Sequence, residues 1–334
     1  MAGKKNVKSA IADMAAAVRK KFAGNKDANV GIGLTSLPRV TRWVPTGCPP
    51  LDIILGGGIP CGRITELYGD ESHGKSAVGE SILASAQKEG IVPILIDTEY
   101  SLEEQKAQRW GLSLPELLPL YPETMEQCFD IIHTTIEAQK KLEMPVVIVW
   151  DTMAATPTQK ELDARYGDET PARQARVMSN ALKKIYQEIA KTETSLVVLN
   201  QTREKIGVQF GSKKTTPGGK ALRFYASIRA EIRIIKRLKK DETVIGIETE
   251  IRTVKNKLTH PLKTCLAHIY FASGVHPGES ILATLKKLGL LKASGPKLKM
   301  EGQSFTKKEL LEGLEQDKDV EKELKRLIHD AIFI

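Results

Sequence analysis

The sequence predicts an α/β fold, in which helices flank a central, mostly parallel and twisted sheet. A strand-like segment, 63–68, and a helical segment, 77–86, lie on either side of a glycine-rich turn at 69–76. Two further segments, 92–98 and 145–150, are continuous apolar runs of the kind that form parallel strands buried on both faces. Helical patterns separate these runs, as the βαβ units of a parallel sheet require.

The composition is that of an ordinary soluble globular protein. Hydrophobic residues make up 41% and charged residues 27% of the 334 residues. No apolar run approaches the length of a membrane span, and no signal-peptide pattern precedes the first charges, so we expect no membrane partner and a cytoplasmic or nucleoid-associated protein, or one in the host cytoplasm if the source is viral. The cysteines include no C-x-x-C pair, which predicts neither a disulfide framework nor a zinc site. We expect them to be small core residues or partly exposed free thiols: Cys48, Cys61, Cys128 and Cys265.

The positive charge of the chain is concentrated in two regions. The formal net charge is +9 and the isoelectric point is about 9.2. Residues 203–257 contain 15 Lys/Arg and 6 Asp/Glu, and residues 1–30 contain 7 and 2. Such clusters favour a polyanionic partner, and a solvated basic face is the alternative.

The N-terminal 30 residues carry one helical apolar stripe. Its members are spaced by four or three residues: Val7, Ile11, Met14, Val18 and Phe22. One amphipathic helix is too little to fold alone. We therefore expect it to pack on its own chain or on a neighbouring subunit. Residues 24–39, rich in Gly, Asn and Asp, are predicted to form a loop.

The turn at 69–76 fits the phosphate-binding pattern G-x-x-x-x-G-K-[ST]. Its glycines allow backbone N–H groups to turn inward around phosphates. Lys75 can reach the β- and γ-phosphates, and the Ser76 hydroxyl can ligate Mg²⁺. The helix that follows, from Ala77, presents its N-terminus to the anion. The pattern predicts a nucleoside triphosphate site.

Polar residues end three of the predicted core strands. Glu99 follows strand 92–98 and is well placed to polarise an attacking water, although a carboxylate there could also cap a helix. Asp151 follows the apolar run 145–150, which is the Walker B pattern in which the Asp holds Mg²⁺ through water. Gln201 closes strand 195–199, where it could sense a γ-phosphate; a lone Gln at such a place is more often a structural cap.

The remaining core segments alternate between helix, loop and strand. Helices are predicted at 51–55, 124–140 and 173–192, and an exposed loop at 156–170. Residues 203–219 are too polar for a core strand and long for a connection, which favours a mobile functional loop.

The last part of the chain predicts two more strands and a small α+β module. Residues 228–238 and 244–254 alternate as strands of the same sheet. A helix at 281–290 and a hairpin at 292–302 follow. Thr306 and Glu309 form a capping box before two final helices.

Three long stretches, 46–76, 200–229 and 248–263, make the chain similar to the RecA family of homologous-recombination ATPases. The resemblance extends from about Asn6 to Ile332. It implies an N-terminal oligomerisation helix with linker (1–33), a RecA-type P-loop ATPase core (34–276) and a small C-terminal α+β domain (277–334).

The implied function is that of a DNA-dependent ATPase. It would use ATP and Mg²⁺, form helical filaments on single-stranded DNA, and catalyse homologous pairing and strand exchange with duplex DNA in recombination and repair. A ring-forming motor or regulator of the same fold is one alternative, and an ATP-gated protein that coats single-stranded DNA is another.

The resemblance also assigns roles to individual residues. The catalytic residues would be Lys75, Glu99, Gln201, Lys255 and Lys257. The nucleotide would be bound by Gly69, Asp70, Glu71, Ser72, His73, Gly74, Lys75, Ser76, Ala77, Glu103 and Asp151, and Mg²⁺ by Ser76 and Asp151. DNA would be bound by loops at about 161–170 and 202–219, and by Arg176, Ser179, Lys183, Arg203, Ile206, Val208, Pro217, Gly218, Gly219 and Lys220. The subunit interface would contain Phe224, Lys255 and Lys257.

The chain departs from the family pattern at several positions. Lys106 stands where an aromatic side chain commonly stacks on adenine. Asp70 and His73 replace P-loop residues that are usually uncharged. Asp70 would bring negative charge near the phosphates and weaken ATP binding, or it is a solvated acid at a loop tip. Residues 292–334 hold nine basic and nine acidic residues and lack an acidic tail. Five lysines could gather duplex DNA or form a solvated face: Lys286, Lys287, Lys292, Lys297 and Lys299.

Overall fold

The computed structural model describes residues 7–21, 40–165, 173–204, 214–300 and 302–333. The chain divides into two compact units, Met1–Thr41 and Arg42–Ile334. Helix α1 (Val7–Lys21) belongs to the first unit. Its side chains Ile11, Met14 and Val18 are exposed, while Phe22 and residues 24–39 lie outside the described residues. The proposed division at 33 and 276 stays a prediction.

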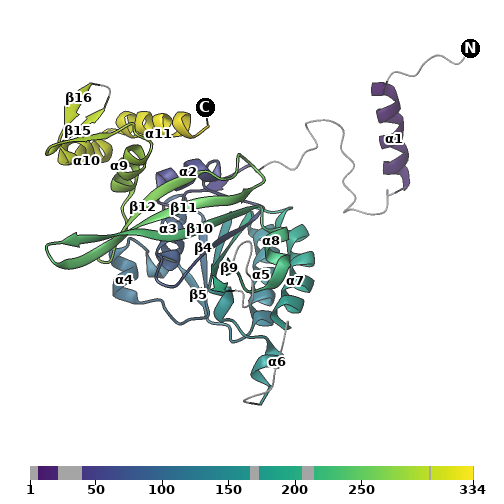
Figure 1. Ribbon diagram of the computed structural model, residues 1–334. Coiled ribbons are helices and arrows are strands. Elements are labelled where there is room, and N and C mark those ends of the chain that lie inside the picture. The colour runs from purple at the N-terminus through teal and green to yellow at the C-terminus, as the bar shows by residue number, and fades with distance from the viewer. Residues whose placement is uncertain (1–6, 22–39, 166–172, 205–213, 301, 334) are drawn as a thin grey trace, which may run out of the picture. The chain divides into compact units, whose positions relative to one another are not determined.

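In the described part of the chain, nine strands form one mixed sheet (Figure 1). Their order across the sheet is β13-β12-β11-β10-β3-β7-β6-β4-β5. Neighbours from β10 to β5 are parallel, and neighbours from β13 to β10 are antiparallel. The bounds are β3 (Ile64–Gly69), β4 (Val92–Asp97), β5 (Leu118–Leu120), β6 (Val146–Asp151), β7 (Thr194–Gln201), β10 (Ile228–Lys240), β11 (Thr243–Asn256), β12 (Thr264–Tyr270) and β13 (Gly274–Val275).

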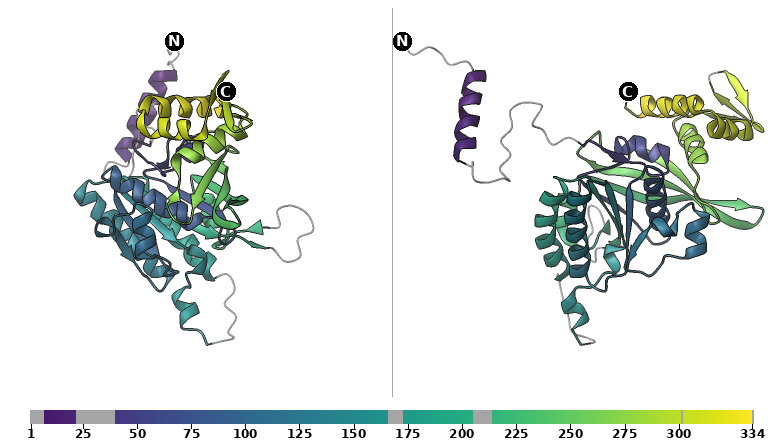
Figure 2. Two further views of the ribbon diagram at one scale, coloured as in Figure 1. Left: turned by 90° about the vertical axis from the view of Figure 1, so that its left-hand side faces the viewer. Right: turned by 180° about the vertical axis from the view of Figure 1, so that it is seen from behind.

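Helices cover both faces of the sheet (Figure 2). One core contains side chains of α2, α3, α9, α10 and α11, and the other contains those of α5, α7 and α8. The bounds are α2 (Pro49–Leu55), α3 (Lys75–Lys88), α4 (Glu104–Arg109), α5 (Met125–Leu142), α6 (Gln159–Leu162), α7 (Arg173–Ile189), α8 (Gly219–Tyr225), α9 (Pro277–Lys287), α10 (Lys307–Gln316) and α11 (Lys318–Phe333). Short strands complete the structure: β1 (Trp43–Val44), β2 (Ile59–Pro60), β8 (Arg203–Glu204), β9 (Lys214–Thr215), β14 (Lys292–Ser294), β15 (Lys297–Met300) and β16 (Gln303–Phe305).

Close packing of α3 on the sheet positions the phosphate loop. A Cβ atom at Gly79 would lie 3.0 Å from Leu199 Cδ1 and 3.1 Å from Val149 Cγ1. Any side chain at Gly79 would therefore push the helix away from β6 and β7. On the opposite face, Phe129 of α5 packs edge-on against Trp150 of β6, with ring centroids 5.5 Å apart.

The predicted α/β fold is confirmed, but several elements were not predicted, among them the helices α4 and α8. The predicted loop at 156–170 contains α6, because Thr158 and Glu161 form a capping box there. Strands β5, β12 and β13 were not predicted. β12 escaped notice because it lies near the sheet edge and pairs with β11 over a short, mostly buried segment. All four cysteines are buried, as the core interpretation expected.

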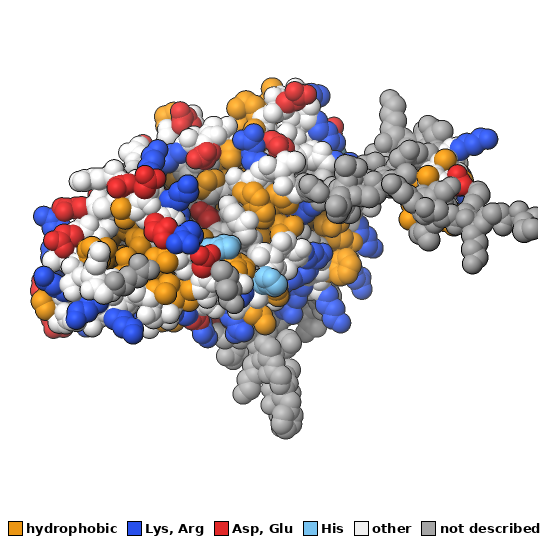
Figure 3. All heavy atoms as spheres, turned by 90° about the horizontal axis from the view of Figure 1, so that it is seen from above, with side chains coloured by type: hydrophobic (Ala, Val, Ile, Leu, Met, Phe, Trp, Pro, Cys, Tyr) orange, Lys and Arg blue, Asp and Glu red, His pale blue; other side chains and the backbone are white. Residues whose placement is uncertain are grey.

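The C-terminal module, residues 277–333, combines α9–α11 with the sheet β14-β15-β16. The predicted hairpin and the Thr306–Glu309 capping box are confirmed. Acidic and basic side chains are interspersed on the face seen from above (Figure 3).

Within the described residues, no helix has both the length and the apolar character needed to cross a membrane.

His268 of β12 forms two ion pairs, one within the sheet and one to α9. Its Nε2 lies 2.6 Å from Glu248 Oε2 on β11, and its Nδ1 lies 3.0 Å from Glu279 Oε2 on α9. Tyr270 and Lys307 also bond to Glu279. The positive charges of Lys236 and Lys286 favour the ionised form of Glu248. Burial acts against the charged ring, but the two carboxylates prevail and raise the pKa of His268.

A raised pKa in the folded state has a predictable pH signature. The stabilisation by His268 is complete below the pKa of the unfolded chain and is lost as the pH rises through the higher folded pKa. His268→Gln should therefore cost on the order of 2 kcal/mol at mildly acidic pH and less at alkaline pH. Urea unfolding of both proteins across this range tests it. His329→Gln, at an exposed histidine, is the control. The prediction would be contradicted if the loss of unfolding free energy in His268→Gln did not change with pH.

Candidate functional site

The phosphate loop joins β3 to α3 through a left-handed glycine. Gly74 precedes α3 with φ 91°, and a Cβ atom there would lie 2.6 Å from Ile269 Cδ1. Lys75 is 7% exposed, and its Nζ donates to the Asp70 carbonyl at 2.6 Å. Burial lowers the pKa of Lys75, and the charges of Asp151 and Glu99 oppose this effect. The ammonium group thus lies close enough to Asp151 and Glu99 for their charges to act on it.

The two unusual loop residues are tied to the sheet. The Thr202 hydroxyl, just beyond β7, donates to Asp70 Oδ1. His73 Nδ1 lies 3.3 Å from the Ile232 carbonyl of β10. The half-buried Asp70 side chain thus links the phosphate loop to the end of β7, and its effect on ATP binding stays a prediction.

Ser76 and Asp151 bring two hard oxygen ligands together. The Ser76 hydroxyl lies close to the Asp151 carboxylate. Asp151 is buried at the end of β6, directly opposite Asp97 at the end of β4. Burial raises the pKa of Asp151, and the nearby Ser76 hydroxyl partly offsets this. A hydroxyl and one carboxylate beside a phosphate site fit Mg²⁺, which usually keeps water and phosphate as its other ligands.

Glu99 and Gln201 meet although they are far apart in sequence. Gln201 Nε2 donates to Glu99 Oε1 at 3.2 Å. Burial, followed by the charge of Asp151, raises the pKa of Glu99. A carboxylate beside a charged lysine and a primary amide can hold a water molecule and accept its proton.

Asp97 orients the loop that carries Glu99, and sequence reasoning gave it no role. Its fully buried carboxylate accepts bonds from the backbone N–H groups of Glu99, Ser101 and Leu102, at 3.2, 2.9 and 3.0 Å. An Asp two residues before Glu99 at a strand end is the signal that could have revealed it, because Asp side chains commonly bond to the backbone two residues later.

Glu103 and Lys106 lie on the segment after this loop. The Glu103 carboxylate caps α4 by accepting from the N–H groups of Gln105 and Lys106 at 3.2 and 2.7 Å. Lys106 Nζ lies 2.9 Å from Glu80 Oε1 and 4.7 Å from the ring centre of Trp110. Lys106 is therefore held against α3 by an ion pair.

Lys255, Lys257 and Phe224 form a second group. Lys255 Nζ donates to the carbonyls of Arg223 and Phe224 at 2.6 and 2.9 Å. Lys257 Nζ lies 5.9 Å from the ring centre of Phe224, which is 70% exposed. Burial, together with the charge of Lys257, lowers the pKa of Lys255 to about 8. An exposed aromatic ring with two cations suits contact with another protein surface.

A buried network connects the strands between these two groups, and sequence reasoning missed it. Asn200 Nδ2 donates to Glu66 Oε1 at 3.0 Å and to the Pro217 carbonyl at 3.4 Å. Arg229 of β10 also bonds to Glu66. Its guanidinium lies 4.8 Å from the ring centre of Tyr68. A Glu inside an otherwise apolar buried strand is the signal that such a network exists, because a buried charge needs partners.

The residues predicted to bind DNA lie on α7 and beside α8. Arg176, Ser179 and Lys183 share one face of α7, since they are spaced by three and four residues. Arg176 lines a cavity of about 330 Å³ together with Lys160 and Arg173. Arg203 lies in β8, and Pro217, Gly218, Gly219 and Lys220 lie at the start of α8. Ile206 and Val208 lie outside the described residues, as do residues 166–170 of the first predicted loop.

Gly218 allows α8 to approach the core, and its replacement should be costly. Gly218 has φ +82°, and a Cβ atom would lie 2.9 Å from Met153 Cε. Gly218→Ala should lower the free energy of unfolding by about 1–3 kcal/mol, because strain and overpacking act together. Gly111→Ala is a matched control, since Gly111 has φ +83° and nothing within 4 Å of the added Cβ. Urea unfolding compares them; equal costs would mean that the Met153 contact contributes nothing.

Comparison with known proteins identifies the family. A family model for the RecA N-terminal domain matches residues 8–276. The chain belongs to the RecA family. It is 37% identical over 302 residues to Protein RecA of Mesomycoplasma hyopneumoniae. The aligned region covers 90% of this chain and 87% of that protein. It is 39% identical over 272 residues to Protein RecA of Symbiobacterium thermophilum, covering 81% and 76%.

A third relative, Protein RecA of Thermus thermophilus, is 37% identical over 290 residues, covering 86% of this chain and 83% of that protein. The chain is accordingly a RecA-type recombinase, a DNA-dependent ATPase of strand exchange. The family uses ATP with Mg²⁺. The expected fold and enzyme class are thereby confirmed, and the ring-forming motor and the coating protein are not favoured.

Proposed function

We propose that each ATP site of this recombinase is shared by two adjacent subunits. One subunit supplies the phosphate loop, Asp151, Glu99 and Gln201, and the next supplies Lys255 and Lys257. The observation that carries the proposal is the division into two groups. Glu99 and Gln201 are in contact at 3.2 Å beside the loop, whereas the contacts of Lys255 and Lys257 are with α8 and the exposed Phe224. Head-to-tail assembly would bring the second group of one copy to the first group of the next.

Within one site, the side chains of this chain divide the work. Lys75 and the backbone of 69–76 would hold the phosphates, and Ser76 and Asp151 would hold Mg²⁺, which would supply positive charge to offset that of the phosphates. Glu99 positions the attacking water and accepts its proton. The incoming lysines stabilise negative charge that develops in the transition state, as arginine fingers do.

Gln201 would couple nucleotide binding to DNA binding. Its amide N–H donates to Glu99. A γ-phosphate oxygen would compete for that donor, and a change at Gln201 would pass directly to Thr202 and Arg203, where the second DNA loop begins. The bond from Thr202 to Asp70 gives the same strand end a second link to the phosphate loop. The unusual Asp70 supports this proposal because it makes that link.

The protein would bind DNA without recognising particular bases. Exposed Arg176 and Lys183 and the lysine at 220 are cations suited to phosphates. Ile206 and Val208, outside the described residues, would contact bases. Sequence recognition is then left to base pairing between the bound strand and the incoming duplex.

Assembly would use the exposed stripe of α1 on a neighbouring copy. An apolar cavity of about 510 Å³ beside the edge strand β5 offers a receiving surface, lined by Ile94, Leu118, Leu120, Ile131, Leu142 and Met144 among others. Leu142 is 69% exposed and Met144 45%, which would otherwise leave large apolar side chains in water.

The test is the ATPase rate with and without single-stranded DNA, with negative-stain images of the same samples. Strong stimulation by DNA together with helical filaments is expected, and Met14→Glu should shorten the filaments. DNA-independent turnover, closed rings, or no binding to single-stranded DNA in ATP would overturn the proposal.

A further inference from the structure

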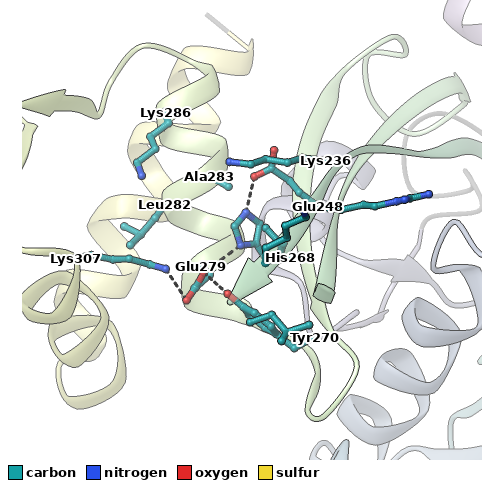
Figure 4. A pocket seen from close by; sticks show the side chains of 13 residues that line it. Lys236, Glu248, His268, Tyr270, Glu279, Leu282, Ala283, Lys286 and Lys307 are labelled. Atoms are coloured by element: carbon teal, nitrogen blue, oxygen red, sulfur yellow. Dashed lines mark hydrogen bonds and ion pairs between the residues drawn. The ribbon is translucent and has the colours of Figure 1, made fainter. Parts of the chain in front are cut away.

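A second cavity lies between the β10–β11 hairpin and the C-terminal module (Figure 4). Its volume is about 560 Å³, within the range of small-molecule sites. None of its lining residues belongs to the nucleotide site or to the two predicted DNA-binding loops, although Lys286 is one of the five lysines that could gather duplex DNA. They are Lys236, Arg237, Leu238, Lys239, Ile245, Glu248, His268, Tyr270, Glu279, Leu282, Ala283, Lys286 and Lys307.

The acidic groups of this cavity are already satisfied. Glu279 accepts from Tyr270 at 2.8 Å, and it pairs with Lys307 at 2.8 Å and with His268 at 3.0 Å. Glu248 pairs with the other ring nitrogen of His268 at 2.6 Å. Both nitrogens face carboxylate oxygens, so the ring donates at both when it is protonated as an imidazolium. An incoming anion therefore meets no unpaired carboxylate.

Cations from two elements remain available. Lys236 of β10 extends toward α9, and Lys286 of α9 faces the same space (Figure 4). Neither has a hydrogen bond or ion pair within the described residues. Their neighbour Lys287, by contrast, is paired with Glu250. Arg237, Lys239 and Lys307 also line the cavity. The lining therefore contains five Lys/Arg side chains and two Glu side chains.

The rest of the lining is apolar. Leu282 and Ala283 of α9 and Leu238 and Ile245 of the hairpin provide a hydrophobic wall. A ligand that suits both parts carries an anionic group and an apolar or aromatic body. The cations converge on one hollow from facing elements, which favours a compact ligand over a long strand lying on a flat surface.

We propose that this cavity binds a small phosphorylated molecule with a ring-shaped body, such as a mononucleotide. The phosphate would bridge Lys236 and Lys286, with the His268 imidazolium behind it. The body would lie against Leu282 and Ala283. Occupancy would connect the sheet hairpin to the C-terminal module by charge-assisted bonds across the cavity. The site is separate from the phosphate loop, so it does not depend on how ATP is hydrolysed.

The test is calorimetric titration of the full chain with AMP, which lacks the β- and γ-phosphates that the phosphate loop holds. Binding should survive Lys75→Ala and weaken about tenfold or more in the double variant Lys236→Glu/Lys286→Glu. Lys292→Glu/Lys297→Glu makes the same change in charge within the C-terminal module at two lysines that do not line the cavity, and it should bind as the wild type does. Lys236→Arg/Lys286→Arg should retain most of the affinity.

Four results would overturn the proposal. The first is no binding of AMP to the wild-type chain at millimolar concentration. The second is loss in Lys75→Ala with retention in Lys236→Glu/Lys286→Glu, which would assign the signal to the phosphate loop. The third is equal weakening in both charge-reversed variants. The fourth is that a short DNA duplex depends on Lys236 and Lys286 while AMP does not, which would make this surface a nucleic-acid contact.

Discussion

Glu99→Gln should slow ATP hydrolysis by about 10²–10⁴-fold, the contribution typical of a general base. Glutamine keeps the shape of the side chain and can still contact Gln201, but it cannot accept a proton at neutral pH. ATP binding by Lys75 and Ser76 should be unchanged. We therefore expect stable filaments on single-stranded DNA that fail to turn over.

The measurement combines steady-state ATPase with strand exchange between a single strand and a homologous duplex. If strand exchange survives in Glu99→Gln, ATP binding drives the pairing and hydrolysis serves recycling. Glu104→Gln is the control, because Glu104 is exposed nearby and bonds to Gln108. Hydrolysis at the wild-type rate in Glu99→Gln would refute the assignment of the base.

The double variant Lys255→Ala/Lys257→Ala should lose hydrolysis to a similar degree, and a mixture should recover it. In an equimolar mixture with Glu99→Gln, about one site in four of a random head-to-tail filament has an intact Glu99 on one side and intact lysines on the other. ATPase of the mixture should approach that fraction of wild type. This holds only if the lysines act across the interface.

The competing outcome is equally clear. If Lys255 and Lys257 act on the ATP of their own subunit, no mixture of the two proteins restores activity. Lys239→Ala/Lys240→Ala removes the same charge from the hairpin and should leave hydrolysis near wild type. Native-gel or light-scattering assembly of each variant separates loss of catalysis from loss of the filament.

Much of the nucleotide site could be predicted because its signals are local. The phosphate-loop pattern spans eight consecutive residues. The spacing of apolar residues on either side predicts the strand before it and the helix after it. Glu99, Asp151 and Gln201 were found because each lies at or just beyond the end of a buried strand, and parallel strands end at one edge of their sheet. The α6 capping box was missed for the opposite reason, since Pro157 and Gly167 suggested only loop.

The sequence by itself determined the phosphate loop, the core strands and the residues at their ends, because backbone preference and burial depend on near neighbours in the chain. Only the tertiary structure decided which side chains meet. The order of strands brings Asn200 and Arg229 to Glu66, Gln201 to Glu99, and Thr202 to Asp70. It also encloses His268 between two carboxylates from different elements. Such contacts join residues tens to hundreds of positions apart, and no local pattern encodes a partner that only the arrangement of the sheet supplies.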